Sequence, residues 1–175
     1  AVHMGTWYAG DLLDVTDWPV NRTASLAGIA MMDVFARIEN NGSIDSFSWT
    51  EGSRATGSVV FNASGDYDVS ITLSDLGLEN CPNSYCGSGF TSAMTKGAMG
   101  NITWQASSAY GNANFVSSVS SNNGLSGDAK ISELKQMYGN LFGKSNHIEA
   151  GANLVFSREN NSELIMMTGT AILSE

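Results

Sequence analysis

The chain has 175 residues, the length of one domain and enough to bury a core without a metal or many disulfides. Its 8 Lys and Arg against 17 Asp and Glu give a formal net charge of −9, which argues against nucleic acid or an anionic membrane as partner, because both require a positive surface. Only 14% of the residues are charged, and Ser, Gly and Asn are abundant, a composition typical of turn-rich β proteins. No apolar run approaches the ~20 residues of a membrane helix, so no transmembrane segment is expected.

The first 23 residues are expected to form an N-terminal extension, and residues 24–175 the main domain. The extension opens with AVHM, which resembles residues left by an expression vector, so His3 and Met4 carry no functional weight.

Period-two alternation of apolar residues dominates the first half of the domain. In residues 24–38 one parity is apolar and the other mixed, so periodicity alone does not exclude a helix there. The turn NNGS precedes two separate runs, IDSFSW and SVVFNA, and residues 55–75 form the clearest hairpin. The pairs Met31-Met32 and Met166-Met167 should each place one Met on either face of a strand, so that only half of these side chains reach the core.

Residues 76–92 interrupt the alternation and predict a long loop, of a kind that often carries function. A disulfide between Cys81 and Cys86 would shape this loop and indicate an oxidising compartment; the rival interpretation is a pair of reduced or buried thiols. The spacing is poor for a metal, and no metal site is expected. Tyr85 and Phe90 are aromatic residues that the loop can present to a partner; alternatively, Phe90 begins the next strand and Tyr85 covers the disulfide.

Alternation returns in the second half of the domain, most strictly in HIEAGANLVFS. The preceding ELKQMYGNL is predicted as a strand that turns at a Tyr138-Gly139 corner, or as a single helical turn. The residues expected to face the core lie on the apolar parity of their strands: Phe61, Val69, Ile71, Trp104, Leu154 and Phe156.

About eight strands at regular spacing predict an all-β fold, a single antiparallel up-and-down β-barrel, with a sandwich as the alternative. Glycines inside or beside the strands, such as Gly28 and Gly169, would provide the bulges or bends that barrel closure requires. The chain has few charged residues to protect sheet edges, and closure would remove those edges.

Residues suited to catalysis are few, and no enzyme is expected. His147 is the only histidine beyond the first four residues, and no G-x-S-x-G motif nominates a nucleophile. His147 can serve as an axial haem ligand or as a surface hydrogen-bonding residue. Tyr138 can also ligate haem iron, or it can pack with its hydroxyl satisfied. Haem therefore stays open as a cofactor, and no other cofactor is implied.

The last third of the chain carries a pattern of small and aromatic residues, G-x-A-x-(apolar)…(Phe/Tyr)-Tyr-Gly…Gly…Phe…Gly-x-(apolar). Its matches are Gly127, Ala129, Ile131, Tyr138, Gly139, Gly151, Phe156, Gly169 and Ala171. Over most of residues 24–175 the chain resembles the C-terminal eight-stranded barrel of bacterial transferrin-binding-protein-B-like surface lipoproteins and haemophilin-type secreted haemophores. Met137 replaces the first of the family's paired aromatics, and Asn140 and Leu141 replace its usual Pro and acidic residue. The resemblance implies a barrel that acts as a scaffold or a partner-recognition module.

A second, less extensive resemblance lies near the N-terminus, where GTWY at residues 5–8 looks like the lipocalin opening G-x-W. The later lipocalin motifs are not found. Both resemblances imply an eight-stranded antiparallel barrel.

The sequence thus predicts a non-catalytic binding module that is secreted, periplasmic or on the outer surface of a bacterial cell, with a link to haem, iron or host-protein capture. The alternatives are a structural or adhesion module of a larger surface protein, and a lipocalin-like carrier. The expected partner is a protein or a small apolar ligand, bound by loops at one barrel mouth. The candidate binding residues are Tyr85, Phe90, Tyr138 and His147.

Overall fold

A computed structural model of the chain describes residues 10–40, 42–76, 100–122, 131–160 and 163–175. They form a short 3-10 turn and eight strands: η1 (Val15–Asp17), β1 (Arg22–Asn40), β2 (Ser43–Phe61), β3 (Tyr67–Ser74), β4 (Ile102–Ser108), β5 (Asn114–Asn122), β6 (Ser132–Lys144), β7 (His147–Glu159) and β8 (Glu163–Ser174). Among these residues, none belongs to a helix long and apolar enough to cross a membrane.

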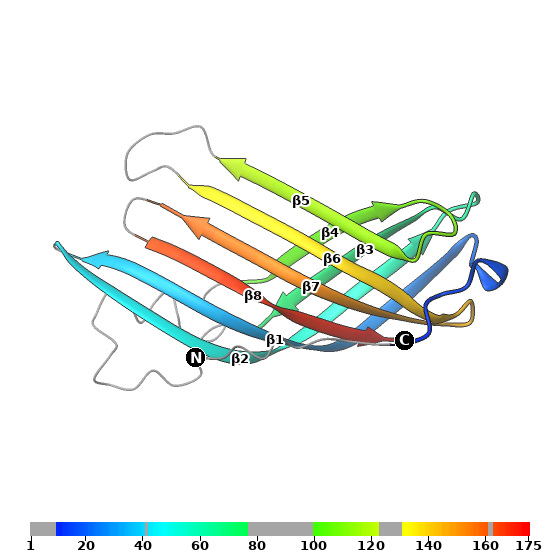
Figure 1. Ribbon diagram of the computed structural model, residues 1–175, viewed down its shortest axis with the longest axis horizontal. Coiled ribbons are helices and arrows are strands. Elements are labelled where there is room, and N and C mark those ends of the chain that lie inside the picture. Colours follow the sequence, from blue (N-terminus) through cyan, green and yellow to red (C-terminus); the bar gives the residue numbers. More distant parts are fainter. Residues whose placement is uncertain (1–9, 41, 77–99, 123–130, 161–162) are drawn as a thin grey trace.

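The eight strands make one nearly closed antiparallel barrel of up-and-down topology, as predicted (Figure 1). Strands that are neighbours in sequence pair with each other, except β4 and β5, and β1 also pairs with β8, which gives the order β4-β3-β2-β1-β8-β7-β6-β5. Among the described strands, β4 and β5 form the two ends of this sheet and are not joined by a ladder. They separate from their common hairpin and leave a seam along the barrel wall (Figure 1).

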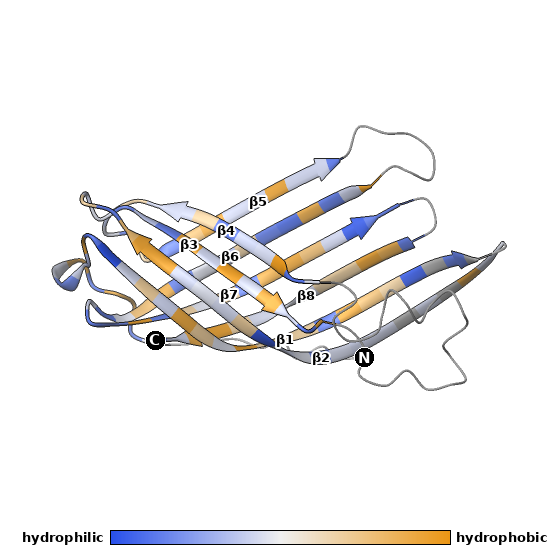
Figure 2. Ribbon diagram, turned by 180° about the vertical axis from the view of Figure 1, so that it is seen from behind, coloured by the Kyte–Doolittle hydropathy of each residue, from blue (hydrophilic) through white to orange (hydrophobic). Residues whose placement is uncertain are grey.

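Alternating burial along β1 shows why residues 24–38 are a strand. The even-numbered Leu26, Ala30 and Met32 are buried, whereas the odd-numbered Ile29 and Met31 are exposed. A helix would group its buried residues at three- and four-residue spacing instead, so the helical alternative is wrong here. Similar alternation of hydropathy is visible along several other strands (Figure 2).

The methionine pairs behave as their positions in strands predict. Met32 and Met167 are inside the barrel at 0% and 1% exposure, and their neighbours Met31 and Met166 lie outside it at 42% and 48%. One methionine of each pair therefore packs in the core.

Strand β2 is one continuous strand, although the sequence suggested two separate runs. Each of its residues from Ser43 to Phe61 has a partner on β1 in an unbroken register. The polar TEGSR stretch between the two runs stays extended because the β1 ladder holds it.

The Tyr138-Gly139 pair lies in the middle of β6, so the predicted corner and the predicted helical turn are both wrong. Gly139 is needed for space rather than for a turn. A Cβ atom at this position would overlap the ring of Phe115 on β5 and the backbone oxygen of Gly151 on β7.

Among the described residues, apolar side chains form one buried cluster that fills the barrel interior below the end where β5 finishes. The six residues predicted to face the core are all buried: Phe61, Val69, Ile71, Trp104, Leu154 and Phe156. The indole of Trp104 on β4 is bonded to β7, where its Nε1 donates a hydrogen bond to the backbone oxygen of Val155 at 2.9 Å. A single side chain thus connects these two strands through the core.

Two interior glycines let β1 and β8 approach each other closely. A Cβ at Gly28 would overlap the carbonyl oxygen of Ile172, and a Cβ at Gly169 would overlap that of Met31. The β1–β8 register continues through both glycines without a bulge, so they serve close approach of the backbones.

One end of the barrel is closed by an aromatic cluster around Trp18. The Trp18 ring lies 6.0 Å from Phe61 and 5.9 Å from both Tyr67 and Tyr110, between ring centroids. Its Nε1 donates to the backbone oxygen of Gly65 at 2.7 Å. Leu13 and Trp18, from the segment before β1, therefore belong to the same core, and we call this end the plugged end.

Candidate binding surface

The opposite end of the barrel, which we call the open mouth, has charged residues on the core-facing side of its strands. On β6, Met137 is buried, and Lys135 and Glu133 follow on the same face of the strand. Their side chains form an ion pair at 3.2 Å and are only 30% and 29% exposed. Arg158 on β7 lies directly opposite Glu133 in the register. The barrel interior thus changes from apolar to charged near its mouth.

Trp49 and Glu51 on β2 belong to the same mouth. Trp49 is half-buried and packs against the core, and its Nε1 donates to the Glu51 carboxylate at 2.9 Å. An aromatic ring with a satisfied polar edge is a common contact residue in protein recognition.

An open depression of about 580 Å³ adjoins the mouth where β5, β6, β7 and β8 end. The charged residues in its lining are Glu133 and Glu159, and the others are small polar residues and two leucines: Ser120, Ser121, Asn122, Ser132, Leu134, Ser157 and Leu164. The lining thus combines two carboxylates with hydroxyl and amide groups and two leucines. Both carboxylates have a basic partner: Glu133 pairs with Lys135 at 3.2 Å, and Glu159 lies 3.9 Å from Arg37.

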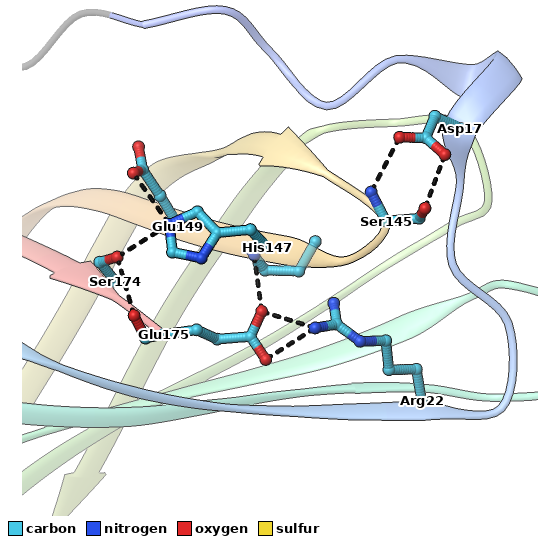
Figure 3. A network of polar contacts seen from close by, with 8 residues as sticks. Asp17, Arg22, Ser145, His147, Glu149, Ser174 and Glu175 are labelled. Carbon is cyan, nitrogen blue, oxygen red and sulfur yellow. Dashed lines mark hydrogen bonds and ion pairs between the residues drawn. The ribbon is translucent and has the colours of Figure 1, made fainter.

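His147 lies at the plugged end, on the outside of the barrel, within a network of polar contacts (Figure 3). Its Nε2 is 3.4 Å from the Glu149 carboxylate and 3.3 Å from the Ser174 hydroxyl. The side chain is half exposed, at 52%. These surroundings match the surface hydrogen-bonding interpretation of His147.

Asp17 and Ser145 tie η1 to the β6–β7 turn at this same end (Figure 3). The backbone N–H and the hydroxyl of Ser145 donate to the Asp17 carboxylate at 3.0 and 2.6 Å. These hydrogen bonds favour the ionised carboxylate and hold the pKa of Asp17 below its usual value.

Glu175 joins β1, β7 and the chain segment after β8 (Figure 3). Arg22 Nη2 donates to both of its carboxylate oxygens, at 2.7 and 2.6 Å, and the Ile148 N–H donates at 2.7 Å. Burial disfavours the charged form, but the Ile148 and Arg22 hydrogen bonds and the positive charge of Arg22 outweigh it, so the pKa of Glu175 is lowered.

The Arg22–Glu175 pair should stabilise the fold above the ordinary carboxyl pKa of 4.5 and lose this effect as the pH falls through the lower folded value. Both side chains are about a quarter exposed or less, so we expect a coupling free energy of about 0.5–1 kcal/mol at pH 7. A double-mutant cycle with Arg22→Met and Glu175→Gln, followed by urea denaturation at pH 7 and pH 3, measures it. A coupling that is equal at both pH values would contradict this assignment.

Tyr138 and His147 do not form one site. Tyr138 is 54% exposed on the outer face of β6. The β6 residue opposite His147 is Lys144, six positions along the strand from Tyr138, or roughly 20 Å. The two side chains that the sequence nominated as haem ligands are therefore separate, and both lie outside the barrel.

The other predicted candidates lie outside the described residues. These are Tyr85 and Phe90, the Cys81–Cys86 disulfide and the GTWY motif. They stay predictions from the sequence.

A row of apolar side chains lies on the outer face of β1 and β8, and only its two methionines, Met31 and Met166, were named from the sequence. Ile29 is paired with Ile172, and Phe35 with Met166, with Met31 between the pairs. These side chains are between 37% and 66% exposed. We call these five residues the outer row.

The charged residues of the open mouth were not predicted from the sequence either, although the sequence contains a pattern that indicates them. Glu133 and Lys135 continue the core parity of Met137, so two charges stand where apolar residues are expected. Such a change of polarity at the end of a strand indicates the point where a barrel interior meets solvent.

Comparison with known proteins gives no further assignment: no family model matches the chain, and no curated protein matches it.

Proposed function

We propose that this chain is a non-catalytic binding module that is secreted, periplasmic or exposed on a bacterial cell surface, and that it recognises a partner with its open mouth and outer wall. The observation that carries the proposal is the filled interior. Trp104 connects β4 to β7, and Phe115, Met137 and Leu154 are almost completely buried around the same core. A barrel filled by side chains favours recognition on its surface over carriage of a ligand inside.

The nature of the partner follows from the resemblance to transferrin-binding-protein-B-like barrels and haemophilin-type haemophores, in which the barrel is often a scaffold or a recognition module. We propose a host protein that carries iron or haem as the partner. The half-buried Trp49 and the charged pair Glu133 and Lys135 at the mouth support protein recognition. Tyr85 and Phe90 are the further candidates from the sequence.

Surface plasmon resonance tests this proposal. It measures binding of the purified chain to a panel of serum proteins that carry iron or haem. We expect saturable binding to at least one of them, and weaker binding for a Lys135→Ala, Arg158→Ala double variant at the mouth. Val60→Ala, at an exposed position on the outer face of β2 close to the plugged end and away from both the mouth and the outer-face residues of β1 and β8, is the control and should bind as the wild type does.

Two parallel measurements test the carrier alternatives. Haem alone is added and its Soret band recorded, and a lipophilic dye is added and its fluorescence recorded. We expect neither signal to saturate at one equivalent. Saturation with haem or dye, without binding to any panel protein, would contradict the proposed function and favour a carrier.

The outer row favours a second candidate function, a structural module of a larger surface protein. Its apolar side chains on two paired strands are suited to packing against another domain. An absence of binding in all three measurements would support this candidate.

A further inference from the structure

The seam of the barrel leaves one side of β5 without a strand partner. Strand β5 pairs with β6 along its entire length from Asn114 to Asn122, in an unbroken register. On its other side the nearest strand in sequence is β4, and no ladder joins the two in the described residues. A strand with one unpaired side presents a row of backbone N–H and C=O groups to any extended chain.

The ladder determines which backbone groups face the seam. The Leu141 N–H donates to the Ala113 backbone oxygen at 2.8 Å, so the backbone of residue 113 points toward β6. Because this direction alternates along an antiparallel strand, residues 115, 117 and 119 also bond to β6, and Val116, Ser118 and Ser120 point into the seam. The Asn114 backbone oxygen agrees with this pattern, since it accepts the Ser108 hydroxyl of β4 at 2.8 Å.

Only the first part of the seam is sealed. The Tyr67 hydroxyl donates to the backbone oxygen of Asn112 at 2.9 Å and contacts that of Asn114 at 3.3 Å, and the Asn112 amide donates to Ser108. Burial raises the pKa of Tyr67 to about 12, so this donor stays protonated at neutral pH. Beyond Asn114, within the part of the chain that the structure describes, no hydrogen bond is made by the seam-facing backbone of Val116, Ser118 or Ser120.

The inner face of β5 is also uncovered along the open part of the seam. Val119 lies on the same face of the strand as Phe115, which is 1% exposed, yet Val119 itself is 57% exposed. A strand laid along β5 would cover Val119 with one of its own side chains.

Strand β5 carries none of the features that protect natural sheet edges. Its sequence, NFVSSVSSN, has no charged residue and no proline, and its register has no bulge. The edge is therefore chemically open to pairing.

We propose that the β5 edge binds an extended segment of a partner polypeptide, which adds as a strand antiparallel to β5 through hydrogen bonds to Val116, Ser118 and Ser120. This inference rests on the proposed role as a binding module and assigns its surface and the conformation of its ligand. Backbone hydrogen bonds supply the affinity in this mode, and alternate side chains supply the specificity.

The surroundings of the edge define the chemistry of the segment. An apolar side chain of the segment, facing the core, would cover Val119. Polar side chains of the segment would lie beside Ser118 on the outer face. The edge ends at the depression, where Glu133 and Glu159 are the charged lining residues. The net charge of −9 favours a segment that carries basic residues, and in the antiparallel direction the N-terminal part of the segment lies at this mouth end of the edge. The net charge of −9 on each chain disfavours a second copy of this protein as the occupant.

A short synthetic peptide, in which lysines precede alternating valine and threonine, is the probe for this edge. Amide hydrogen exchange of the full chain is followed by NMR with and without the peptide. We expect exchange at Val116, Ser118 and Ser120 to slow by about tenfold or more, because these amides gain partners. The amides of residues 115, 117 and 119, which already bond to β6, should change little. The same peptide with N-methyl groups on alternate amides is the matched control and should give no protection.

Two substitutions at one position separate the backbone from the side chain. Ser118→Pro removes a seam-facing N–H, and Ser118→Ala keeps it; both lose the same side-chain hydrogen bond from Gln136. The peptide should bind Ser118→Pro about tenfold more weakly or worse, and Ser118→Ala within about twofold of the wild type. If circular dichroism shows that Ser118→Pro is unfolded, Ser120→Pro against Ser120→Ala makes the same comparison nearer the strand end.

Each outcome decides the proposal. No protection, or equal protection by the N-methylated peptide, overturns it. Protection that rises with protein concentration without peptide, together with a dimer in sedimentation, shows a second copy on the edge and overturns the choice of occupant. A panel protein that binds the proline variant as well as the wild type leaves the proposed function standing and removes this edge from it. If the peptide slows amide exchange at β5 but no serum protein of the panel binds, the edge site is supported and the link to iron or haem is rejected.

Discussion

Replacing Trp104 with alanine should lower the free energy of unfolding by about 3–5 kcal/mol. The side chain is 1% exposed, so its removal leaves a large cavity in the core. The loss also leaves the backbone oxygen of Val155 without the indole donor that lies 2.9 Å away. Urea denaturation followed by far-ultraviolet circular dichroism measures the change.

Gln105→Ala is the matched control for this substitution. Gln105 is the next residue on β4 and faces solvent, so its replacement should change stability by less than about 0.5 kcal/mol. Equal effects at the two positions would mean that β4 does not present alternate faces to core and solvent.

Replacing Leu154 with alanine should cost about 2–5 kcal/mol, the range expected for a leucine that is fully buried. Leu154 is 0% exposed on the inner face of β7, and the two strands that flank β7 limit how far the site can collapse. The same denaturation experiment measures the loss, with Ser157→Ala on the outer face of β7 as control. A loss below about 0.5 kcal/mol for Leu154→Ala would show that the inner and outer faces of β7 are exchanged.

The residues on the inner face of the barrel could be predicted because side chains alternate between the two faces of a strand and because this core is apolar. Trp104 and Leu154 follow from that rule alone. The same rule places Tyr138 and His147 on the outer face, since both lie opposite to the core parity of their strands. The haem interpretation of these two residues relied on residue type, which carries no information about the distance between them.

A glycine explains the error at the predicted corner in β6. The sequence predicts a corner at Gly139, which instead lies within the long strand β6. Gly139 makes room for the ring of Phe115, which lies 24 positions earlier in the sequence, and no local pattern reports such a contact.

The seam could not be predicted, because it depends on which strands fail to meet. The connection between β4 and β5 contains Gly111 and Asn112, as a turn does, and β4 alternates between buried and more exposed residues, whereas β5 does so only near Phe115. Whether two strands pair along their full length depends on the twist and closure of the whole sheet, a property of all eight strands together.

The pairing of β1 with β8 also has a consequence for how the chain reaches its native state. Ala27 lies opposite Ser174, so strands from the two ends of the sequence share one ladder at the centre of the sheet. Seven of the eight strands are synthesised before β8, the second partner of β1, exists. Contacts between residues so distant in sequence must overcome a large loss of chain entropy, and topologies rich in them fold in milliseconds to seconds. Until β8 arrives, one edge of β1 and one edge of β7 are exposed, which makes the unfinished chain the form most open to pairing with other polypeptides.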